Sequence, residues 1–385
     1  MDFQIYLACA FAIFWTYLGY PIFLLALSKY KHQYIRTGPL EPKVSIIIAA
    51  YNEQLHIKDK IESCLAIDYP KEKLEIIVAS DCSSDDTNEI VRSYESRGVI
   101  LADIKYRGGK TAAQNHAATK SSGEILVFTD ASTEIPKNVL QSMVSNFYDE
   151  RVGCVGADLQ YVSDQQSSVG KGNLAYWNYE RKIRELETSI NSLVGVSGAL
   201  YAVRSSLYTG LEADMSSDFV IASDIFLKNK ITVNSSLVTS VEKTNEKTQD
   251  EFKMRVRVAV GSINALIRYS RLLNPFQHGL YSIQLLSHKV LRYTAPLFLI
   301  TLFLVNFSIA LDSDSKLLLF SFYGQCLFYA SALLGWLAQE LKIKIPGLHI
   351  PFYFCSINAA ALWAWYLYFK GERMVVWTPN RQELD

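Results

Sequence analysis

The chain has 385 residues and carries 38 basic and 38 acidic side chains, so its formal net charge is zero. Half of the residues are hydrophobic, 12% are aromatic and 20% are charged, a composition that excludes a disordered or low-complexity protein. Without a net positive charge, the chain lacks the long-range field of a nucleic-acid-binding protein, and we expect no nucleic-acid partner. The length suggests two or three domains.

Uncharged segments long enough to cross a bilayer lie at both ends of the chain. The first runs from Phe3 to Ser28, and three more follow later: Thr294–Leu311, Leu317–Gln339 and Ile345–Phe369. A bilayer core of roughly 30 Å is crossed by about 20 apolar helical residues. Basic residues follow the first segment instead of preceding it, which favours an uncleaved anchor over a secretory signal peptide.

Basic residues border the middle section on both sides. Lys29, Lys31 and Arg36 precede it, and residues 252–292 contain seven basic side chains and no acidic one. The positive-inside rule therefore predicts an integral protein of the inner or plasma membrane, in contact with its lipids, whose middle section is cytoplasmic. The predicted organisation is an N-terminal anchor (1–28), a cytoplasmic domain (29–251), basic interfacial helices (252–292), about three transmembrane helices (293–370) and a tail (371–385).

The sequence leaves open on which side of the membrane the tail lies. One span before the cytoplasmic domain and three after it place the tail outside, whereas Lys370, Arg373 and Arg381 favour the inside. A late segment that lies in the interface or re-enters the bilayer would reconcile the two. The six cysteines show neither CxxC nor Cys/His ligand spacing, so we expect no disulfides and no structural zinc, in keeping with a reducing compartment.

The middle section alternates between predicted strands and predicted helices. Continuous apolar runs rich in β-branched residues are typical of strands that are buried on both faces. The predicted strands are Val44–Ala50, Leu74–Ser80, Val99–Ile104 and Glu124–Thr129, and the predicted helices are Gln54–Leu65, Thr87–Arg97, Lys110–Lys120 and Pro136–Phe147. Such repeated units predict an α/β fold with a mostly parallel sheet and helices on both of its faces.

Acidic residues follow three of the predicted strands. Glu53 comes after the first strand, Asp81 after the second and Asp130 after the fourth. Ligands of open parallel sheets bind beyond the carboxyl ends of the strands, so together the three acids indicate a binding site. Each alone is as easily a helix cap or a turn residue.

The segment Arg107-Gly108-Gly109-Lys110-Thr111 invites a phosphate-loop interpretation. That motif requires a glycine at the position of Ile104, which makes a membrane ATPase a distant alternative. A glycine turn that presents one lysine at a helix N-terminus is still suited to bind the phosphate of a ligand. The dinucleotide pattern GxGxxG is absent after the first strand, which argues against a dehydrogenase.

Six motifs occur in an order that resembles the family-2 inverting glycosyltransferases, membrane-anchored relatives of the cellulose, chitin and hyaluronan synthases. They are VSIIIAAYNE, VASDCSSDD, RGGKTAAQN, VFTDAST, VGVSGALYAVR and SSDFV. The resemblance covers roughly Val44 to Gly261 and the arrangement of the membrane segments. It implies a glycosyltransferase A-type (nucleotide-diphospho-sugar transferase) fold, with transmembrane helices before and after it in the chain.

The resemblance also implies roles for residues that would bind a UDP-sugar donor. Glu53 and Asp81 match positions that hold the uridine, Tyr51 is a further donor-binding candidate, and Lys110 would lie near the phosphates or the sugar. Asp130 would bind Mg²⁺ or Mn²⁺, which would bridge the diphosphate. Where the family carries a second acid, this chain has Ser132, so one carboxylate would share the metal with the donor phosphates and water.

The same resemblance implies the residues on the acceptor side. Asp218 matches the aspartate that removes the proton of the attacking hydroxyl. Asp224 is the competitor within the sequence, although a helix-surface acid is its simpler interpretation. The turn Ser197-Gly198-Ala199 matches the lining of the acceptor pocket, with a packing turn as the alternative. Trp177 offers a face for stacking on a sugar, although a core tryptophan is the commoner case.

Two arginines occupy the region where processive synthases carry the motif QxxRW. Arg257 keeps the arginine of this motif, but its Gln and Trp are missing, which weakens the case for a long-polymer synthase. Arg255 and Arg257 are expected either to bind the donor diphosphate or to face lipid headgroups. Trp377 and the residues after it resemble the tail of these transferases.

The resulting hypothesis is a metal-dependent, membrane-bound inverting hexosyltransferase that adds one or a few sugars to a glycan or a lipid-linked acceptor in surface polysaccharide synthesis. A processive synthase that exports its polymer is the nearest alternative. An inactive scaffold that binds nucleotide or glycan is an alternative of another class. Other polysaccharide-assembly proteins are expected partners.

Overall fold

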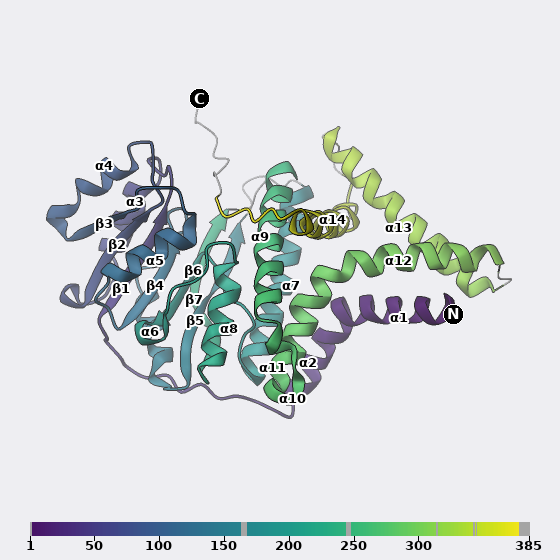
Figure 1. The fold of residues 1–385 in the computed structure, drawn as a ribbon, viewed down its shortest axis with the longest axis horizontal. Coiled ribbons are helices and arrows are strands. Elements are labelled where there is room, and N and C mark those ends of the chain that lie inside the picture. The colour runs from purple at the N-terminus through teal and green to yellow at the C-terminus, as the bar shows by residue number, and fades with distance from the viewer. Residues whose placement is uncertain are drawn as a thin grey trace. The chain divides into compact units, whose positions relative to one another are not determined.

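The computed structural model describes residues 2–162, 168–243, 248–312, 315–341, 343 and 345–376 (Figure 1). The chain forms two compact units. The sheet unit comprises Tyr30–Val162, Arg181–Glu242 and Met374–Asp385, and the helical unit comprises Met1–Lys29, Ser163–Glu180 and Lys243–Arg373. Residues 168–180, which the sequence assigns to the domain 29–251, thus cluster with the helical unit, and the predicted domain boundaries stay a prediction.

A seven-stranded sheet forms the centre of the sheet unit, in the order β3-β2-β1-β4-β6-β5-β7. β1 pairs in parallel with β2 and β4, and β3 extends this parallel half from β2, whereas β6 is antiparallel to both β4 and β5. The strands are β1 (Val44–Ala50), β2 (Leu74–Ser80), β3 (Val99–Asp103), β4 (Ile125–Asp130), β5 (Val152–Val162), β6 (Leu200–Arg204) and β7 (Ile231–Lys243). The α/β prediction is confirmed, and the four strands expected from the sequence form the parallel half.

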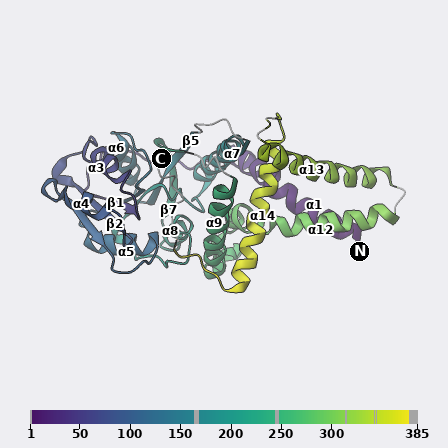
Figure 2. The ribbon, with the colours of Figure 1, turned by 90° about the horizontal axis from the view of Figure 1, so that it is seen from above.

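Helices cover both faces of the sheet (Figure 2). Ile46 and Ile48 of β1 are fully buried in the main apolar core, together with residues of α3 (Ile57–Leu65) and α6 (Val139–Val144). Ile47 is also fully buried, and because side chains alternate along a strand it points to the other face. On that face α5 (Lys110–Lys120) packs against β1. Burial on both faces explains why β1 has no polar alternation.

The predicted helices form, with changes at their ends. α5 has the bounds expected from the sequence. The predicted helix Thr87–Arg97 is divided into α4 (Thr87–Arg92) and a 3-10 turn, and it ends at Gly98, whose φ of 83° is the left-handed conformation that stops helices. The sheet unit also contains α8 (Ser217–Leu227), and α7 (Ser168–Ile190) contributes residues to both units.

Four segments of the helical unit, among the residues the structure describes, are long and apolar enough to cross a membrane. They are Asp2–Ser28, Leu280–Leu311, Lys316–Glu340 and His349–Lys370. The first joins α1 (Asp2–Phe14) through a π-helical turn to α2 (Tyr20–Ser28). The others contain α11 (Leu280–Leu285) with α12 (Leu291–Asp312), α13 (Lys316–Glu340) and α14 (His349–Lys370). These segments agree with the four uncharged runs of the sequence and support association with a membrane.

The segment predicted to lie in the membrane interface continues into one of these spans. α9 (Thr248–Arg268) and the short α10 (Pro275–His278) precede this span, and a π-helical turn within the span joins α11 to α12.

Small residues allow α9 and α14 to pack closely, because Ala259 of α9 and Ala360 and Ala364 of α14 lie in one buried cluster.

A buried carboxylate fixes the segment that enters the sheet unit. The fully buried side chain of Asp149 accepts hydrogen bonds from Arg151 Nε at 3.0 Å and Nη2 at 2.7 Å, and from the backbone N–H of Arg36 at 3.3 Å. The hydrogen bonds from Arg151 lower the pKa of the Asp149 carboxyl below its ordinary value.

We predict that Asp149→Asn lowers the free energy of unfolding by about 1–3 kcal/mol at pH 7. Because the pKa of Asp149 is lower in the folded state, its contribution is complete above about pH 4 and disappears as the pH falls further. Thermal unfolding in detergent should therefore show a large gap from the wild type at pH 7 and a smaller gap at pH 3. Glu150→Gln, at an exposed neighbouring site, serves as the control, and a gap that does not change with pH would contradict the assignment.

Candidate functional site

The carboxyl ends of three parallel strands place acidic residues at one edge of the sheet. The parallel register pairs Ala50 with Ser80, so the loops that carry Glu53 and Asp81 leave neighbouring strands at the same level. The backbone N–H of Asp81 donates to the carbonyl of Ala50 at 2.9 Å. Asp130 is the last residue of β4, on the other side of β1. Glu53 and Asp81 are buried, with 5% and 3% exposure, and Asp130 is partly open to solvent.

Asp81 organises the glycine turn that precedes α5. One of its carboxylate oxygens, Oδ1, accepts the backbone N–H groups of Gly108 at 2.8 Å and of Gly109 at 3.0 Å. Arg107 Nε lies 3.7 Å from the other oxygen, and the Arg107 guanidinium lies 3.4 Å from the centre of the Tyr51 ring. Arg107 was not predicted from the sequence as a site residue, although a cation directly before a Gly-Gly turn was a usable signal. Tyr51, Asp81 and Arg107 thus form one connected wall of the site.

Gly109 occupies a position where a side chain does not fit. Its φ is 85°, and an added Cβ would overlap the backbone carbonyl oxygen of Val375. The end of the described chain therefore packs on the glycine turn, within the sheet unit. Trp377 and the residues after it lie outside the described part of the chain.

Four predicted residues from four separate parts of the sequence meet beside this turn. The ammonium group of Lys110 forms an ion pair with Asp130 and donates to the carbonyl of Gly198 at 3.0 Å. A Cβ added to Gly198 would lie 3.7 Å from the Asp218 Cβ and 3.9 Å from the Lys110 Nζ. Gly198 thus leaves room at the point where one cation and two carboxylates converge. We call Lys110, Asp130, Gly198 and Asp218 the charged cluster.

The start of α8 positions Asp218. The hydroxyl of Ser216 donates to Asp218 Oδ1 at 2.6 Å, and the backbone carbonyl of Asp218 accepts the N–H of Val196 at 3.0 Å. The second bond ties α8 to the turn that holds Ser197, Gly198 and Ala199. Ser216 was not predicted from the sequence, because a serine before a helix is an ordinary cap.

Asp224, the competitor of Asp218, lies on another side of the same helix. Six residues of an α-helix correspond to a rotation of about 240° from Asp218. The backbone carbonyl of Asp224 accepts the N–H of Lys228 near the end of α8, at 3.1 Å. The geometry therefore favours Asp218 as the carboxylate of the charged cluster.

Tyr201 lies buried below the charged cluster and is not suited to exchange protons there. Its ring stacks on Phe128 at 5.0 Å between centres, and its hydroxyl is buried without a hydrogen-bond partner among the described residues. Burial above all raises the pKa of Tyr201 well above its ordinary value, and the carboxylates of Asp218 and Asp130 add to this effect. Tyr201 stays protonated at neutral pH, and its ring contributes to the apolar packing beside the cluster.

A buried lysine supports the loop that carries Asp130. Lys60 of α3 is only 4% exposed, and its Nζ donates to Thr129 Oγ1 at 3.0 Å and to the carbonyl of Thr133 at 2.6 Å. The two bonds hold both ends of the segment that contains Asp130 and Ser132. Lys60 was not predicted from the sequence, although a lysine between Ile57 and Ile61 on a buried helix face was a signal.

Few protein groups are available to bind a metal at this segment. Asp130 offers a partly exposed carboxylate and Ser132 an exposed hydroxyl, and no group of three or more His, Cys, Asp or Glu side chains with metal-binding geometry occurs among the described residues. Mg²⁺ and Mn²⁺ accept one or two protein oxygens when phosphates and water complete the shell. The residues present therefore fit a divalent cation that arrives with a phosphorylated ligand.

Arg255 and Trp177, two further candidates, lie together in the helical unit. Arg255 Nε donates to Glu251 Oε1 at 2.8 Å and Nη2 to the Tyr353 hydroxyl at 2.7 Å. The guanidinium is 4.4 Å from the centre of the Tyr176 ring and 5.2 Å from that of Trp177. Arg255 is thus paired with a carboxylate inside an aromatic cage.

The partly buried Arg257 lies on the same helix, α9. The donor-binding roles of both arginines and the acceptor-binding role of Trp177 stay predictions. They belong to the helical unit, whereas the other candidates belong to the sheet unit.

Comparison with known proteins finds a family profile that matches part of the chain, including the residues of the site up to Gly198. Residues 45–208 match the profile described as "Glycosyl transferase family 2". The poly-β-1,6-N-acetyl-D-glucosamine synthase of Staphylococcus aureus is 26% identical over 232 residues, which cover 58% of this chain and 56% of that protein. The β-monoglucosyldiacylglycerol synthase of Trichormus variabilis is 25% identical over 187 residues, 48% of this chain and 40% of that protein. The chain thus spans only about half the length of these relatives.

A solved structure matches nearly the whole chain. The mannosyltransferase PcManGT of Pyrobaculum calidifontis, determined in complex with GDP-Man and Mn²⁺, has a TM-score of 0.70. The match covers 94% of this chain and 99% of the other, at 22% sequence identity. At this identity the similarity establishes the fold, which is the one expected from the sequence motifs.

We predict that Gly109→Ala releases the segment around Val375 from the glycine turn. Trypsin should then cleave after Arg373 faster than in the wild type, because the added methyl group overlaps the Val375 carbonyl. Gly98→Ala is the matched control, since Gly98 has nearly the same φ of 83° and nothing within 4 Å of an added Cβ. Both variants carry a backbone strain of about 1 kcal/mol, so equal cleavage rates would show that the Val375 segment is not held on the turn.

Proposed function

We propose that this chain, whose residues 45–208 form a glycosyltransferase family 2 domain, is a membrane-bound inverting transferase that uses a UDP-sugar. The acceptor is a glycan or a lipid-linked sugar or lipid in cell-surface polysaccharide synthesis. The observation that carries the proposal is the charged cluster, in which Lys110, Asp130 and Asp218 converge around Gly198. In glycosyl transfer, a carboxylate can accept the proton of the acceptor hydroxyl, and a cation can stabilise the negative charge that develops on the leaving group.

The transfer itself is a single displacement in this proposal. The acceptor hydroxyl attacks the anomeric carbon, a new C–O bond forms on the opposite face, and the bond to the diphosphate breaks with its electron pair on UDP. Asp218 takes the proton of the hydroxyl, and the hydrogen bond from Ser216 holds its carboxylate in place. Lys110 stabilises the negative charge that develops on the diphosphate.

The wall formed by Tyr51, Asp81 and Arg107 is the proposed site for the nucleoside part of the donor. Asp81 already accepts two backbone N–H groups, and a carboxylate has further lone pairs to accept bonds from a base or a ribose. Buried Glu53 lies at the same edge and offers a second acceptor. GDP-Man is the donor in the PcManGT complex, whereas UDP is the nucleotide that we propose for this chain.

The cofactor in this proposal is Mg²⁺ or Mn²⁺, held by Asp130 with Ser132. When bound, the cation would neutralise charge on the leaving diphosphate. Lys60 keeps the Asp130 segment in place through Thr129 and Thr133, and the Asp130 carboxylate itself pairs with Lys110. The protein contributes few ligands, so the metal would bind tightly only together with the donor.

The proposed location of the sheet unit is the cytoplasmic side of the membrane, where nucleotide sugars are made. The basic residues that follow the first span and those of residues 252–292 support this orientation. A processive synthase is the second candidate, because one relative is a poly-β-1,6-N-acetyl-D-glucosamine synthase. Product length decides between them: one or a few added sugars support our proposal, and a ladder of long chains would replace it.

We predict that Asp218→Asn reduces kcat by roughly 10²–10⁴-fold, the usual contribution of a general base. UDP binding, measured by calorimetry, should change little because Asp218 lies on the acceptor side of the charged cluster. Asp224→Asn, on the same helix, is the control and should keep near-normal turnover. If Asp218→Asn remains active, or if Asp224→Asn is inactive, the base is assigned wrongly. Absence of any UDP-sugar turnover in the wild type would favour an inactive scaffold.

Chelation of divalent ions should abolish UDP release, and Mg²⁺ or Mn²⁺ should restore it. We predict that Asp130→Asn raises the metal concentration for half-maximal activity at least about tenfold, a change equal to 1.4 kcal/mol. Ser132→Asp should lower this concentration, since it adds a second carboxylate. Metal titrations of UDP release measure both shifts. Full activity after chelation would contradict a role for the metal.

A further inference from the structure

The motif RGGKTAAQN ends at Asn115, a residue that the proposed mechanism does not use. Asn115 lies on α5, the helix that begins with Lys110 of the charged cluster. Its partly buried side chain contacts residues of the segment 205–216, which joins β6 to α8 and which we call the α8 loop. The loop ends directly before the first turn of α8, where Asp218 lies. Asn115 therefore connects the helix of Lys110 to the loop that leads to Asp218.

The side-chain amide of Asn115 pairs with both backbone groups of Leu211. Its Nδ2 donates to the carbonyl of Leu211 at 2.7 Å, and its Oδ1 accepts the N–H of Leu211 at 3.0 Å. Oδ1 also accepts the hydroxyl of Tyr208 at 2.7 Å. A primary amide carries a donor and an acceptor side by side, so it can hold a backbone residue as a neighbouring strand would. Three hydrogen bonds thus fasten the α8 loop to α5.

The loop is shaped to receive this amide. Gly210 has a φ of 82°, in the left-handed region that favours glycine, and a Cβ added there would lie 3.7 Å from Asn115 Oδ1. Leu211 is only 7% exposed, and the ring of Tyr208 packs on that of Phe128 at 5.0 Å between centres. Burial raises the pKa of Tyr208, so its hydroxyl stays a donor at neutral pH. In this setting the polar groups of the loop depend on the Asn115 amide, because water has little access to replace it.

α5 holds the acceptor side of the site at a second point. Lys110 donates to the carbonyl of Gly198 at 3.0 Å. The N–H of Val196, which leads into the same turn, donates to the backbone carbonyl of Asp218 at 3.0 Å. Asp218 is therefore tied to α5 along two routes, through this turn by Lys110 and through the α8 loop by Asn115. Two attachments fix both the place and the direction of the first turn of α8, whereas one would leave it free to rotate.

We infer that Asn115 is a positioning residue, which sets the distance between the proposed base, Asp218, and the proposed partner of the leaving diphosphate, Lys110. The inference rests on the proposed function and adds to it a residue outside the charged cluster. In a single displacement the base and the cation act on opposite sides of the anomeric carbon, so their separation must match the path of the reaction. A misplacement of about 1 Å lowers turnover by about 100-fold. Asn115 thereby governs kcat and leaves donor binding unchanged.

Asn115→Leu in the purified full-length protein tests the inference, because leucine keeps the branched shape and forms none of the three hydrogen bonds. The substrate is whichever of UDP-glucose, UDP-galactose and UDP-N-acetylglucosamine the wild type turns over fastest. We expect kcat for UDP release to fall by about 100-fold and KM to stay within about twofold. Asn115→Asp keeps the accepted hydrogen bonds and loses the donated one, so its kcat should lie in between. A raised KM with an unchanged kcat would overturn the inference in favour of donor binding.

Two comparisons separate positioning from a loss of stability. Asp149→Asn, which breaks hydrogen bonds of a buried carboxylate at the opposite edge of the sheet, is the control and should keep its kcat. In the Asp218→Asn background, Asn115→Leu should lower kcat by less than about threefold, because an absent base cannot be misplaced. An equal loss in both backgrounds would show a merely structural role and overturn the inference.

Hydrogen exchange at residues 205–219 needs no turnover and reports on the α8 loop directly. Asn115→Leu should speed this exchange, because the amide no longer protects the N–H of Leu211. Unchanged exchange, or a normal kcat in Asn115→Leu, refutes the inference and leaves the proposed function intact. Faster exchange in Asn115→Leu without UDP-sugar turnover in the wild type refutes the proposed function, but not the hold of Asn115 on the loop.

Discussion

The parallel pairing of β1 with β2 and β4 is the constraint on which the candidate site depends. Parallel strands end at the same edge of a sheet, so the loops that carry Glu53, Asp81 and Asp130 must be neighbours. This arrangement requires β1 to be buried on both faces, which its run of apolar β-branched residues allows. A polar residue at Ile47 would therefore disturb both the core and the site.

Hydrogen bonds from buried groups then set the shape of the site before any ligand binds. Asp81 holds the glycine turn through two backbone N–H groups, and Lys60 holds the Asp130 segment through Thr129 and Thr133. Desolvating a carboxylate and an ammonium group is costly, and each is retained with hydrogen-bond partners. Such preorganisation is what stabilises developing charge without further rearrangement.

The helical unit also buries charged groups together with their partners, but among apolar helices. The ion pairs Glu251–Arg255 and Glu180–Arg292 lie between aromatic rings and are largely screened from solvent. A buried ion pair is weak evidence for stability, because desolvation consumes most of its attraction. In membrane segments, ionisable side chains are rare and usually functional.

The parallel half of the fold and many of the site residues could be predicted from the sequence, because they depend on local pattern. α5 has the predicted bounds, and the four uncharged runs correspond to four membrane-length helices. β6 could not be predicted as an antiparallel partner of β4, since the pattern of its five residues does not specify the strand with which they pair. Likewise, Lys60, Arg107 and Ser216 are ordinary polar residues until the fold brings them to the site.

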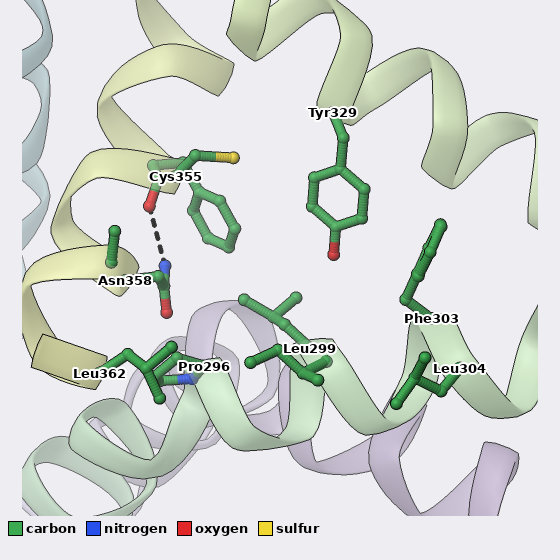
Figure 3. A pocket seen from close by; sticks show the side chains of 11 residues that line it. Pro296, Leu299, Phe303, Leu304, Tyr329, Cys355, Asn358 and Leu362 are labelled. Atoms are coloured by element: carbon green, nitrogen blue, oxygen red, sulfur yellow. Dashed lines mark hydrogen bonds between the residues drawn. The ribbon is translucent and has the colours of Figure 1, made fainter. Parts of the chain in front are cut away.

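Composition, hydropathy and motif order are properties of the chain itself, so the sequence alone determined the α/β class, the membrane-length segments and the family motifs. The meeting of Lys110, Asp130 and Asp218 around Gly198 joins residues up to about a hundred positions apart. A pocket between α12, α13 and α14 likewise joins residues as distant in the sequence as Pro296 and Leu362 (Figure 3). Proximity of this kind comes from packing and strand pairing, which have no trace in local pattern, and only the tertiary structure decided it.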